Sequence, residues 1–228
     1  MATKTNSTVF HLLDLDRTLL DTVALANYLK DIIAKRDVQL SHDIEQEILR
    51  HATARTSFFL FEYIANQVGE TMFEAYIHEL QATAPVEELL LPGALERIAF
   101  GKSQPGWSVG ILTYGSRRDQ MIKLKLVGLQ HERHLVTNTA KKGELIASWQ
   151  LPDGNYKLPI EFGGHIVNTV TLDDDKIIAF ADLPGNALGQ WVTHASIGGI
   201  IELPKIMTNV QPVANLHTSI EYLKTKLV

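Results

Sequence analysis

The 228-residue sequence contains no cysteine, so disulfide bonds and thiolate chemistry are excluded. No apolar run approaches the ~18 consecutive residues that a membrane-spanning helix needs, and the N-terminal segment lacks the apolar stretch of a signal peptide. Neither G-x-G-x-x-G nor G-x-x-x-x-G-K occurs, so these two kinds of nucleotide-binding loop are absent. We therefore expect a cytoplasmic protein that has neither a membrane nor a nucleotide cofactor as partner.

Charge and composition are those of an ordinary globular protein. The sequence has 21 basic and 26 acidic residues, a formal net charge of −5 and 45% hydrophobic residues. This charge is too mild and too acidic to predict nucleic-acid binding, and the apolar content argues against disorder. A length of 228 residues fits one sizeable domain, or a core domain with a smaller one inserted.

Short apolar runs alternate with helical patterns along most of the chain. We expect strands at residues 9–13, 107–115, 134–139, 165–172 and 195–201, and a hairpin at 151–162. We expect helices after a cap at Asp21, from Ser41 or Asp43, and at 56–68, 70–81, 91–100, 117–129, 141–149 and 214–227. Strands that alternate with helices predict βα units and a parallel sheet, hence an α/β fold.

The helices expected between residues 21 and 85 follow one another without an intervening strand. The first of them carries an apolar face at Leu25, Leu29, Ile32 and Ile33. The pattern therefore predicts two domains. Residues 1–20 and 86–228 form an α/β core, and residues 21–85 form an all-helical insertion.

Polar side chains stand at the ends of three expected strands. Asp14 and Asp16 follow the first strand, and Thr113 lies near the end of the second. Asp174 and Asp175 follow the fourth. In an open parallel sheet these ends meet at one rim, where ligands bind. Carboxylate oxygens suit Mg²⁺, and no histidine is grouped with them as a zinc site would favour.

Asp14 and Asp16 are separated by a single residue, so their carboxylates repel each other. A fold keeps such a pair where a cation or a reaction needs it. One can attack phosphorus as a nucleophile, and the other can protonate the leaving oxygen and later activate water. A hydroxyl and a lysine would bind the phosphoryl oxygens. Thr113 offers the hydroxyl, and Lys141 or Lys142 offers the amine.

Four segments resemble, in order, the motifs of the haloacid dehalogenase (HAD) superfamily. "DLDRTLLDT", which begins at Asp14 after an apolar strand, resembles motif I, the D-x-D-x-T of the family's phosphatases. "ILTYG", which contains Thr113, resembles motif II, and "AKKGE" resembles motif III with its lysine at a helix start. "VTLDDDK" resembles the acidic motif IV. The resemblance extends from about residue 9 to about residue 180.

The resemblance implies a Rossmann-like three-layer parallel-sheet core (HAD-like), with the helical insertion as a C1 cap over the site. It implies Mg²⁺-dependent hydrolysis of a small-molecule phosphomonoester, with Asp14 as nucleophile and Asp16 as general acid and base. Thr18 would help hold the loop, and Thr113 and Lys142 would bind phosphate. The residues implied to hold Mg²⁺ are Asp14, Asp16 (also through its backbone carbonyl), Asp174 and Asp175.

Several assignments stay open. Lys141 competes with Lys142 as the motif III lysine, and Asp173 is either a further metal ligand or the cap of the next turn. Arg17 stands where most family phosphatases have glycine, which tolerates unusual backbone angles. The loop therefore differs slightly there, or the arginine side chain reaches the mouth of the site. Segment 151–164 is longer than expected between motifs III and IV.

Other functions compete with the phosphatase. Phosphotransfer to a sugar hydroxyl, as in the family's mutases, uses the same residues, and a catalytically inert HAD-fold binding module is the non-enzymatic alternative. A dehalogenase is disfavoured, because that branch of the family lacks the second aspartate, Asp16. An EF-hand calcium loop is excluded, because it would need glycine in place of Leu19 and glutamate in place of Leu25. Substrate identity and oligomeric state have no signature in the sequence.

Overall fold

The structure is a computed structural model that describes residues 8–54, 56–194 and 207–228. The chain divides into two compact units. The core unit comprises residues up to Leu19, Leu91–Tyr114 and residues from His131 onward, and the helical unit comprises Leu20–Leu90 and Gly115–Gln130. The strand expected at 195–201 lies outside the described residues.

The core unit is built on a six-stranded, wholly parallel sheet with the strand order β3-β2-β1-β6-β7-β8. Its strands are β1 (Val9–Leu13), β2 (Trp107–Tyr114), β3 (His134–Thr137), β6 (Thr169–Asp174), β7 (Leu188–Val192) and β8 (Val210–Val213). The α/β parallel-sheet fold predicted from the sequence is therefore confirmed.

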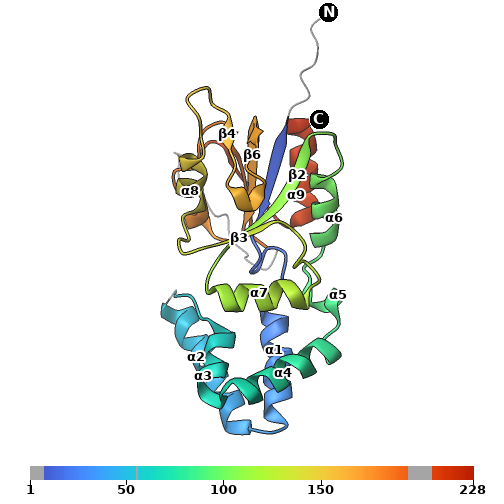
Figure 1. The fold of residues 1–228 in the computed structure, drawn as a ribbon, viewed down its shortest axis with the longest axis vertical. Helices are drawn as coiled ribbons and strands as arrows, with labels where there is room; N and C mark the ends of the chain where they lie inside the picture. Colours follow the sequence, from blue (N-terminus) through green and yellow to red (C-terminus); the bar gives the residue numbers. More distant parts are fainter. Residues whose placement is uncertain (1–7, 55, 195–206) are drawn as a thin grey trace, which may run out of the picture. The chain divides into compact units, whose positions relative to one another are not determined.

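Helices cover both faces of this sheet (Figure 1). On one face, Phe10 and Leu12 of β1 share a buried apolar cluster with Ile146 of α8 (Lys142–Ser148) and with Phe162. The other face carries α6 (Ala94–Gly101) and α9 (Leu216–Leu227), which pack on each other. Every residue of β1 is buried, which explains why all of them except His11 are apolar.

The two central strands end together. Leu13, the last residue of β1, is paired with Asp173 of β6, and the backbone N–H of Asp14 donates to the Asp173 carbonyl at 2.9 Å. Asp14 therefore emerges beside Asp174, at the carboxyl edge of the sheet where parallel folds bind ligands.

The helical unit contains six α-helices within its described residues. They are α1 (Thr22–Ala34), α2 (Val38–Ala54), α3 (Leu60–Val68), α4 (Glu70–Thr83), α5 (Val86–Leu89) and α7 (Arg117–Leu126). Asp21 caps α1 as expected, since its carboxylate accepts from Val23 N at 2.9 Å and from Ala24 N at 3.0 Å. Asp119 of α7 caps α3 in the same way, accepting from the backbone N–H groups of Phe61 and Glu62.

Some expected element boundaries are wrong. Helix α2 begins at Val38 rather than at Ser41 or Asp43, because the Asp37 carboxylate accepts from Leu40 N at 2.8 Å and starts the helix earlier. Helix α3 begins at Leu60 instead of at residue 56.

The segment expected to be a hairpin at 151–162 is also different. It contains the short strand β4 (Tyr156–Lys157) and the 3-10 helix η1 (Ile160–Phe162), and β4 pairs antiparallel with β5 (Ile166–Val167). The hairpin therefore closes later than its turn sequence suggests. A second 3-10 helix, η2 (Ile177–Phe180), follows β6.

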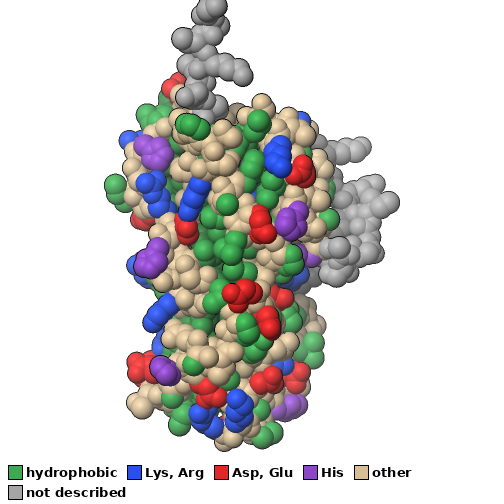
Figure 2. All heavy atoms as spheres, turned by 90° about the vertical axis from the view of Figure 1, so that its right-hand side faces the viewer, with side chains coloured by type: hydrophobic (Ala, Val, Ile, Leu, Met, Phe, Trp, Pro, Cys, Tyr) green, Lys and Arg blue, Asp and Glu red, His purple; other side chains and the backbone are tan. Residues whose placement is uncertain are grey.

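Surface properties of the described residues agree with the composition. None of their helices combines the length and the apolar character that crossing a membrane requires. Acidic and basic side chains are interspersed on the face drawn in Figure 2, without a continuous patch of one sign among the coloured residues.

Candidate active site

Asp14 is held at the end of β1 in a nearly closed environment. Its side chain follows the last strand residue, and the residue is 5% exposed. One carboxylate oxygen contacts the ammonium group of Lys142, and the other accepts from Thr18 Oγ1 at 3.4 Å. The Asp14 carboxylate is therefore held in place from both of its oxygens.

Lys142 is the lysine that the structure brings to this carboxylate. It opens α8, is 2% exposed, and also contacts Asp174 Oδ2 at 2.6 Å. Lys141 instead forms an exposed ion pair with Glu144 at 2.6 Å.

Gly143 explains how α8 comes so close. A Cβ atom at this position would lie 2.2 Å from the carbonyl oxygen of Ala181, so only glycine fits without a backbone shift. The glycine that follows the lysine in "KKGE" thus has a packing reason, and it supports the placement of Lys142.

Three carboxylates form a cluster that suits a hard cation. Oxygens of Asp14, Asp174 and Asp175 lie within 4.8 Å of one another. Asp175 Oδ1 is buried and has no hydrogen-bond partner among the described residues, so its lone pairs are available to a ligand. Oxygen donors of this kind fit Mg²⁺, which takes few carboxylates and completes its shell with water and substrate oxygens. The residues present therefore fit the expected Mg²⁺.

The electrostatics of the cluster favour a bound cation. Burial, with help from the nearby Asp174 and Asp16, raises the pKa of Asp14 to about 7, although Lys142 opposes the shift. Burial and the charge of Asp14 raise the pKa of Asp175 to about 6, and burial also raises that of Asp174. Burial disfavours the charge of Lys142, yet Asp14 and Asp174 together hold the pKa of its ammonium group above the usual value. A cation would favour the ionised form of every carboxyl here.

The three consecutive aspartates of motif IV point in different directions. Asp174 contacts Lys142, and its other oxygen accepts from Lys176 N at 2.8 Å. Asp173 is paired with Arg97 at 2.8 Å, on the opposite face of the sheet, as the alternation of a strand requires. Asp173 therefore does not join the carboxylate cluster, and the structure places Asp174 and Asp175 there.

Arg17 meets both expectations for its position. Its φ of 61° is left-handed, a conformation rare outside glycine. Its side chain also reaches the site, with Nε 3.3 Å from Asp175 Oδ2. The ring of His194 donates to the Arg17 carbonyl and so holds the loop in this conformation.

The two remaining predicted residues, Asp16 and Thr113, are placed differently. Asp16 lines a hollow of about 20 Å³, large enough for a water molecule or an ion of similar size. The residues lining it are Asp14, Asp16, Tyr114, Ala140, Lys142, Asp174 and Lys176. Thr113 is fully buried at the end of β2 and is not among them. Tyr114 and Lys176 were not predicted, although each directly follows a predicted site residue.

Comparisons with known proteins bear on the fold. No protein-family model matches the sequence, and no curated protein matches it. Solved structures do match. A Burkholderia xenovorans protein assigned as a haloacid dehalogenase-like hydrolase has 17% identity and a TM-score of 0.64, with 97% of this chain and 99% of that one covered. The chain has a haloacid dehalogenase-like fold.

Two further HAD-like structures illustrate the range of this fold. Bacillus subtilis YfnB, assigned as a HAD hydrolase and bound to magnesium, has 16% identity and a TM-score of 0.54, with 97% and 99% of the chains covered. A Thermotoga maritima protein assigned as a β-phosphoglucomutase has 16% identity and a TM-score of 0.52, with 96% and 99% covered. L-2-haloacid dehalogenases match as well. The HAD-like fold therefore hosts several reactions, and the site must select among them.

Proposed function

We propose that this chain is a Mg²⁺-dependent phosphatase that hydrolyses a small-molecule phosphomonoester through an aspartyl-phosphate on Asp14. One observation carries the proposal. The buried Asp14 carboxylate contacts Lys142 and lies within 4.8 Å of oxygens of Asp174 and Asp175. A carboxylate that could act as nucleophile, a cation that could bind phosphate and oxygens that could hold a metal thus occupy one edge of the sheet.

In the first step, a carboxylate oxygen of Asp14 attacks phosphorus, and the bond from phosphorus to the substrate oxygen breaks. Asp16, as the acid, gives its proton to that leaving oxygen. In the second step, Asp16 takes a proton from water, whose oxygen attacks phosphorus and breaks its bond to Asp14. Inorganic phosphate leaves, and both aspartates return to their starting forms.

Lys142 and Thr113 would bind the phosphoryl oxygens during both steps. The ammonium group of Lys142 already contacts Asp14, so a phosphoryl group on this carboxylate would lie within its reach. Asp14, Asp174, Asp175 and the backbone carbonyl of Asp16 would hold Mg²⁺, which supplies charge neutralisation to the phosphoryl group. Arg17 next to Asp175 adds positive charge at the same edge.

The helical unit would act as the cap that selects a small phosphorylated substrate. Its described residues contain helices and no strand, which supports this proposal. Neither a nucleic acid nor a membrane is proposed as a partner, and a cytoplasmic location remains a prediction.

Phosphotransfer to a second hydroxyl, as in a mutase, is the alternative that uses the same residues, and a β-phosphoglucomutase assignment occurs among the structural matches. Product analysis separates the two, because hydrolysis releases inorganic phosphate and transfer does not. Release of halide from a 2-haloacid would support a dehalogenase instead, since such enzymes share the fold.

The test is hydrolysis of p-nitrophenyl phosphate with and without Mg²⁺, with wild type and Asp14→Asn compared. We expect Mg²⁺-dependent release of phosphate that the substitution abolishes. A wild type that binds Mg²⁺ but leaves the aryl ester intact would move the test to a panel of phosphorylated metabolites. Neither turnover nor Mg²⁺ binding would contradict the proposal and favour an inert binding module.

A further inference from the structure

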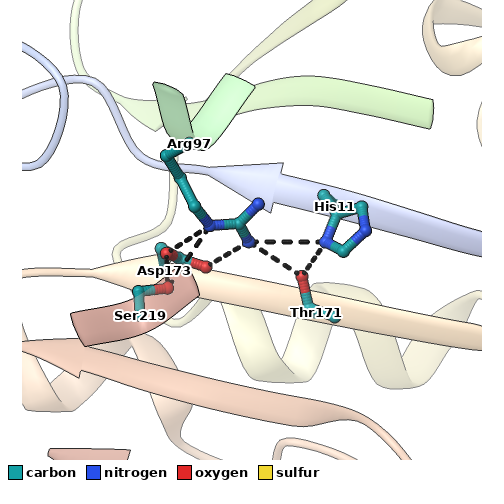
Figure 3. Close-up of polar contacts among 5 residues, drawn as sticks. All are labelled: His11, Arg97, Thr171, Asp173 and Ser219. Atoms are coloured by element: carbon teal, nitrogen blue, oxygen red, sulfur yellow. Dashed lines mark hydrogen bonds and ion pairs between the residues drawn. The ribbon is translucent and has the colours of Figure 1, made fainter. Parts of the chain in front are cut away.

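Five polar side chains form a buried group on the face of the sheet that carries α6 and α9 (Figure 3). They are His11, Arg97, Thr171, Asp173 and Ser219, and each is 0% exposed. They come from β1, α6, β6 and α9, which are far apart in the sequence. Removing an ion pair from water is costly, so a fully buried pair in the core calls for an explanation.

The carboxylate of Asp173 accepts three hydrogen bonds from two residues. Arg97 donates to it twice, from Nε to Oδ2 at 3.0 Å and from Nη2 to Oδ1 at 2.8 Å. Ser219 Oγ donates to Oδ2 at 2.5 Å. Two parallel bonds from a planar guanidinium fix both the position and the plane of a carboxylate. We call Arg97, Asp173 and Ser219 the back-face clamp.

The back-face clamp is joined to the candidate active site through one residue of backbone. The carbonyl oxygen of Asp173 accepts from the backbone N–H of Asp14 at 2.9 Å. The next two residues, Asp174 and Asp175, carry the other carboxylates of the cluster. Fixing the Asp173 side chain therefore fixes the backbone from which all three site carboxylates are placed.

We propose that the back-face clamp is a positioning device, in which Arg97 and Ser219 hold Asp173 so that Asp14, Asp174 and Asp175 keep the spacing that a divalent cation needs. The role in catalysis rests on the proposed function, whereas the effect on spacing does not. Arg97 also neutralises one of three consecutive carboxylates, and so reduces the repulsion that would push Asp174 and Asp175 apart.

Stability alone explains the clamp poorly. Replacing both members of a buried ion pair with apolar residues of similar size is often neutral or stabilising, so stability by itself gives little reason to keep such a pair. Partners that orient metal ligands behave differently, and their loss typically lowers metal affinity or activity by about 10–100-fold.

The test compares wild type with Arg97→Met/Asp173→Leu, which removes both charges together and leaves neither buried without a partner. The matched control is Lys102→Met/Glu132→Leu, which removes an ion pair of the core unit that is partly exposed and has no link to the site. Three quantities are measured: Mg²⁺ affinity by calorimetry, amide hydrogen exchange of Asp14, and kcat and KM for p-nitrophenyl phosphate.

We expect the clamp variant to fold, with Mg²⁺ affinity lowered about 10–100-fold and kcat lowered more than KM is raised. The Asp14 amide should exchange about 10-fold faster or more, while amides in the middle of β2 keep their protection. The control should match wild type in all three quantities.

A folded clamp variant with wild-type Mg²⁺ affinity and wild-type exchange at Asp14 would overturn the inference. If that variant does not fold, Ser219→Ala decides, because it keeps the ion pair and removes one hydrogen bond to Asp173. Ser219→Ala should lower Mg²⁺ affinity and kcat and speed amide exchange at Asp14, as the clamp variant does. Ser219→Thr should restore the wild-type values. If Ser219→Ala shifts none of these quantities, the inference is overturned. The exchange readout needs neither activity nor Mg²⁺. A wild type without phosphatase activity would thus refute the proposed function and leave the clamp to be judged on exchange alone.

Discussion

Lys142 and Lys141 are neighbours in sequence with opposite environments, which makes them a matched pair at the scale of single residues. Lys142 is 2% exposed and contacts two buried carboxylates. The Lys141 side chain is 49% exposed and contacts one surface carboxylate. The proposed function assigns phosphoryl binding to the first, whereas the second is an ordinary surface charge.

We predict that Lys142→Met lowers kcat for an aryl phosphate by at least about 100-fold, because it removes a preorganised cation from the transferring group. Lys141→Met should leave kcat within about 2-fold of wild type, since an exposed pair contributes little. Steady-state kinetics at saturating Mg²⁺ measure both. Equal losses in the two variants would contradict the role of Lys142.

The site residues differ in how visible they are in the sequence. Asp14, Asp16 and the "DDDK" segment were predictable, because two carboxylates at a strand end need a reason to be there. The choice of Lys142 over Lys141 depends on where α8 begins, which Gly143 fixes through its contact with Ala181. Arg97 has no local signal, because its partner Asp173 is 76 residues away.

At the scale of elements, the approach of α8 to the segment after β6 depends on Gly143. A methyl group there would meet the Ala181 carbonyl at 2.2 Å and the Leu183 nitrogen at 2.8 Å. Helix α8 would have to move, and Lys142 would move with it.

Gly143→Ala should therefore lower the free energy of unfolding by about 1–3 kcal/mol, as overpacking of a core does, and should also lower kcat. Gly185→Ala is the control, because a Cβ there meets nothing within 4 Å. Urea denaturation and the aryl-phosphate assay measure the two effects. A Gly143→Ala variant that is as stable and as active as the control would show that α8 tolerates a larger separation.

Element prediction succeeded where the pattern was strong and failed for the last two strands on one side of the sheet. The buried strand β1 and the capped helix α1 lie where expected. Strands β7 and β8 were not predicted. Strand β7 contains a glycine and a glutamine, and β8 contains a proline, which is tolerated because β8 is an edge strand. In both strands, Gly-Gln or Gln-Pro interrupts the β-branched and aromatic residues by which strands are recognised.

At the scale of the whole molecule, the buried His11 links stability to pH. Burial, and then the charge of Arg97, lowers the pKa of His11 well below 6.5. The folded chain therefore keeps this ring neutral at a pH where the unfolded chain protonates it. Above about pH 6.5 the ring is neutral in both states, and His11 does not lower stability. Below that pH, protonation of the unfolded chain lowers the free energy of unfolding by up to ~1.4 kcal/mol per pH unit.

We predict that the free energy of unfolding falls less steeply between pH 7 and pH 5 in His11→Gln than in wild type. His78→Gln should follow wild type, because His78 is exposed. Urea titrations at several pH values give the slopes. Identical slopes for wild type and His11→Gln would mean that the ring protonates equally in both states.

The sequence pattern does not determine to which of the two units α7 belongs. Following β2 directly, α7 reads as part of a βα unit and was placed in the core domain. In the structure it groups with the helical unit, where Asp119 caps α3. Asp119 and Phe61 are 58 residues apart, so periodicity within one segment does not encode their contact.

The polar groups around β6 have a consequence for charge balance. They comprise five carboxylates and four cationic groups, namely Asp14, Asp16, Asp173, Asp174 and Asp175 with Arg17, Arg97, Lys142 and Lys176. With all of them ionised, the formal excess is one negative charge, which a bound divalent cation would more than offset.

Without that cation, protons are the other means of neutralisation, and the raised pKa values of Asp14 and Asp175 agree with this. Mg²⁺ uptake near neutral pH should then expel about one proton, and affinity should rise with pH. Calorimetry in two buffers of different ionisation enthalpy would detect the proton as a difference in apparent heat, and equal heats would contradict the exchange. Mg²⁺ and protons would therefore compete for the same carboxylates.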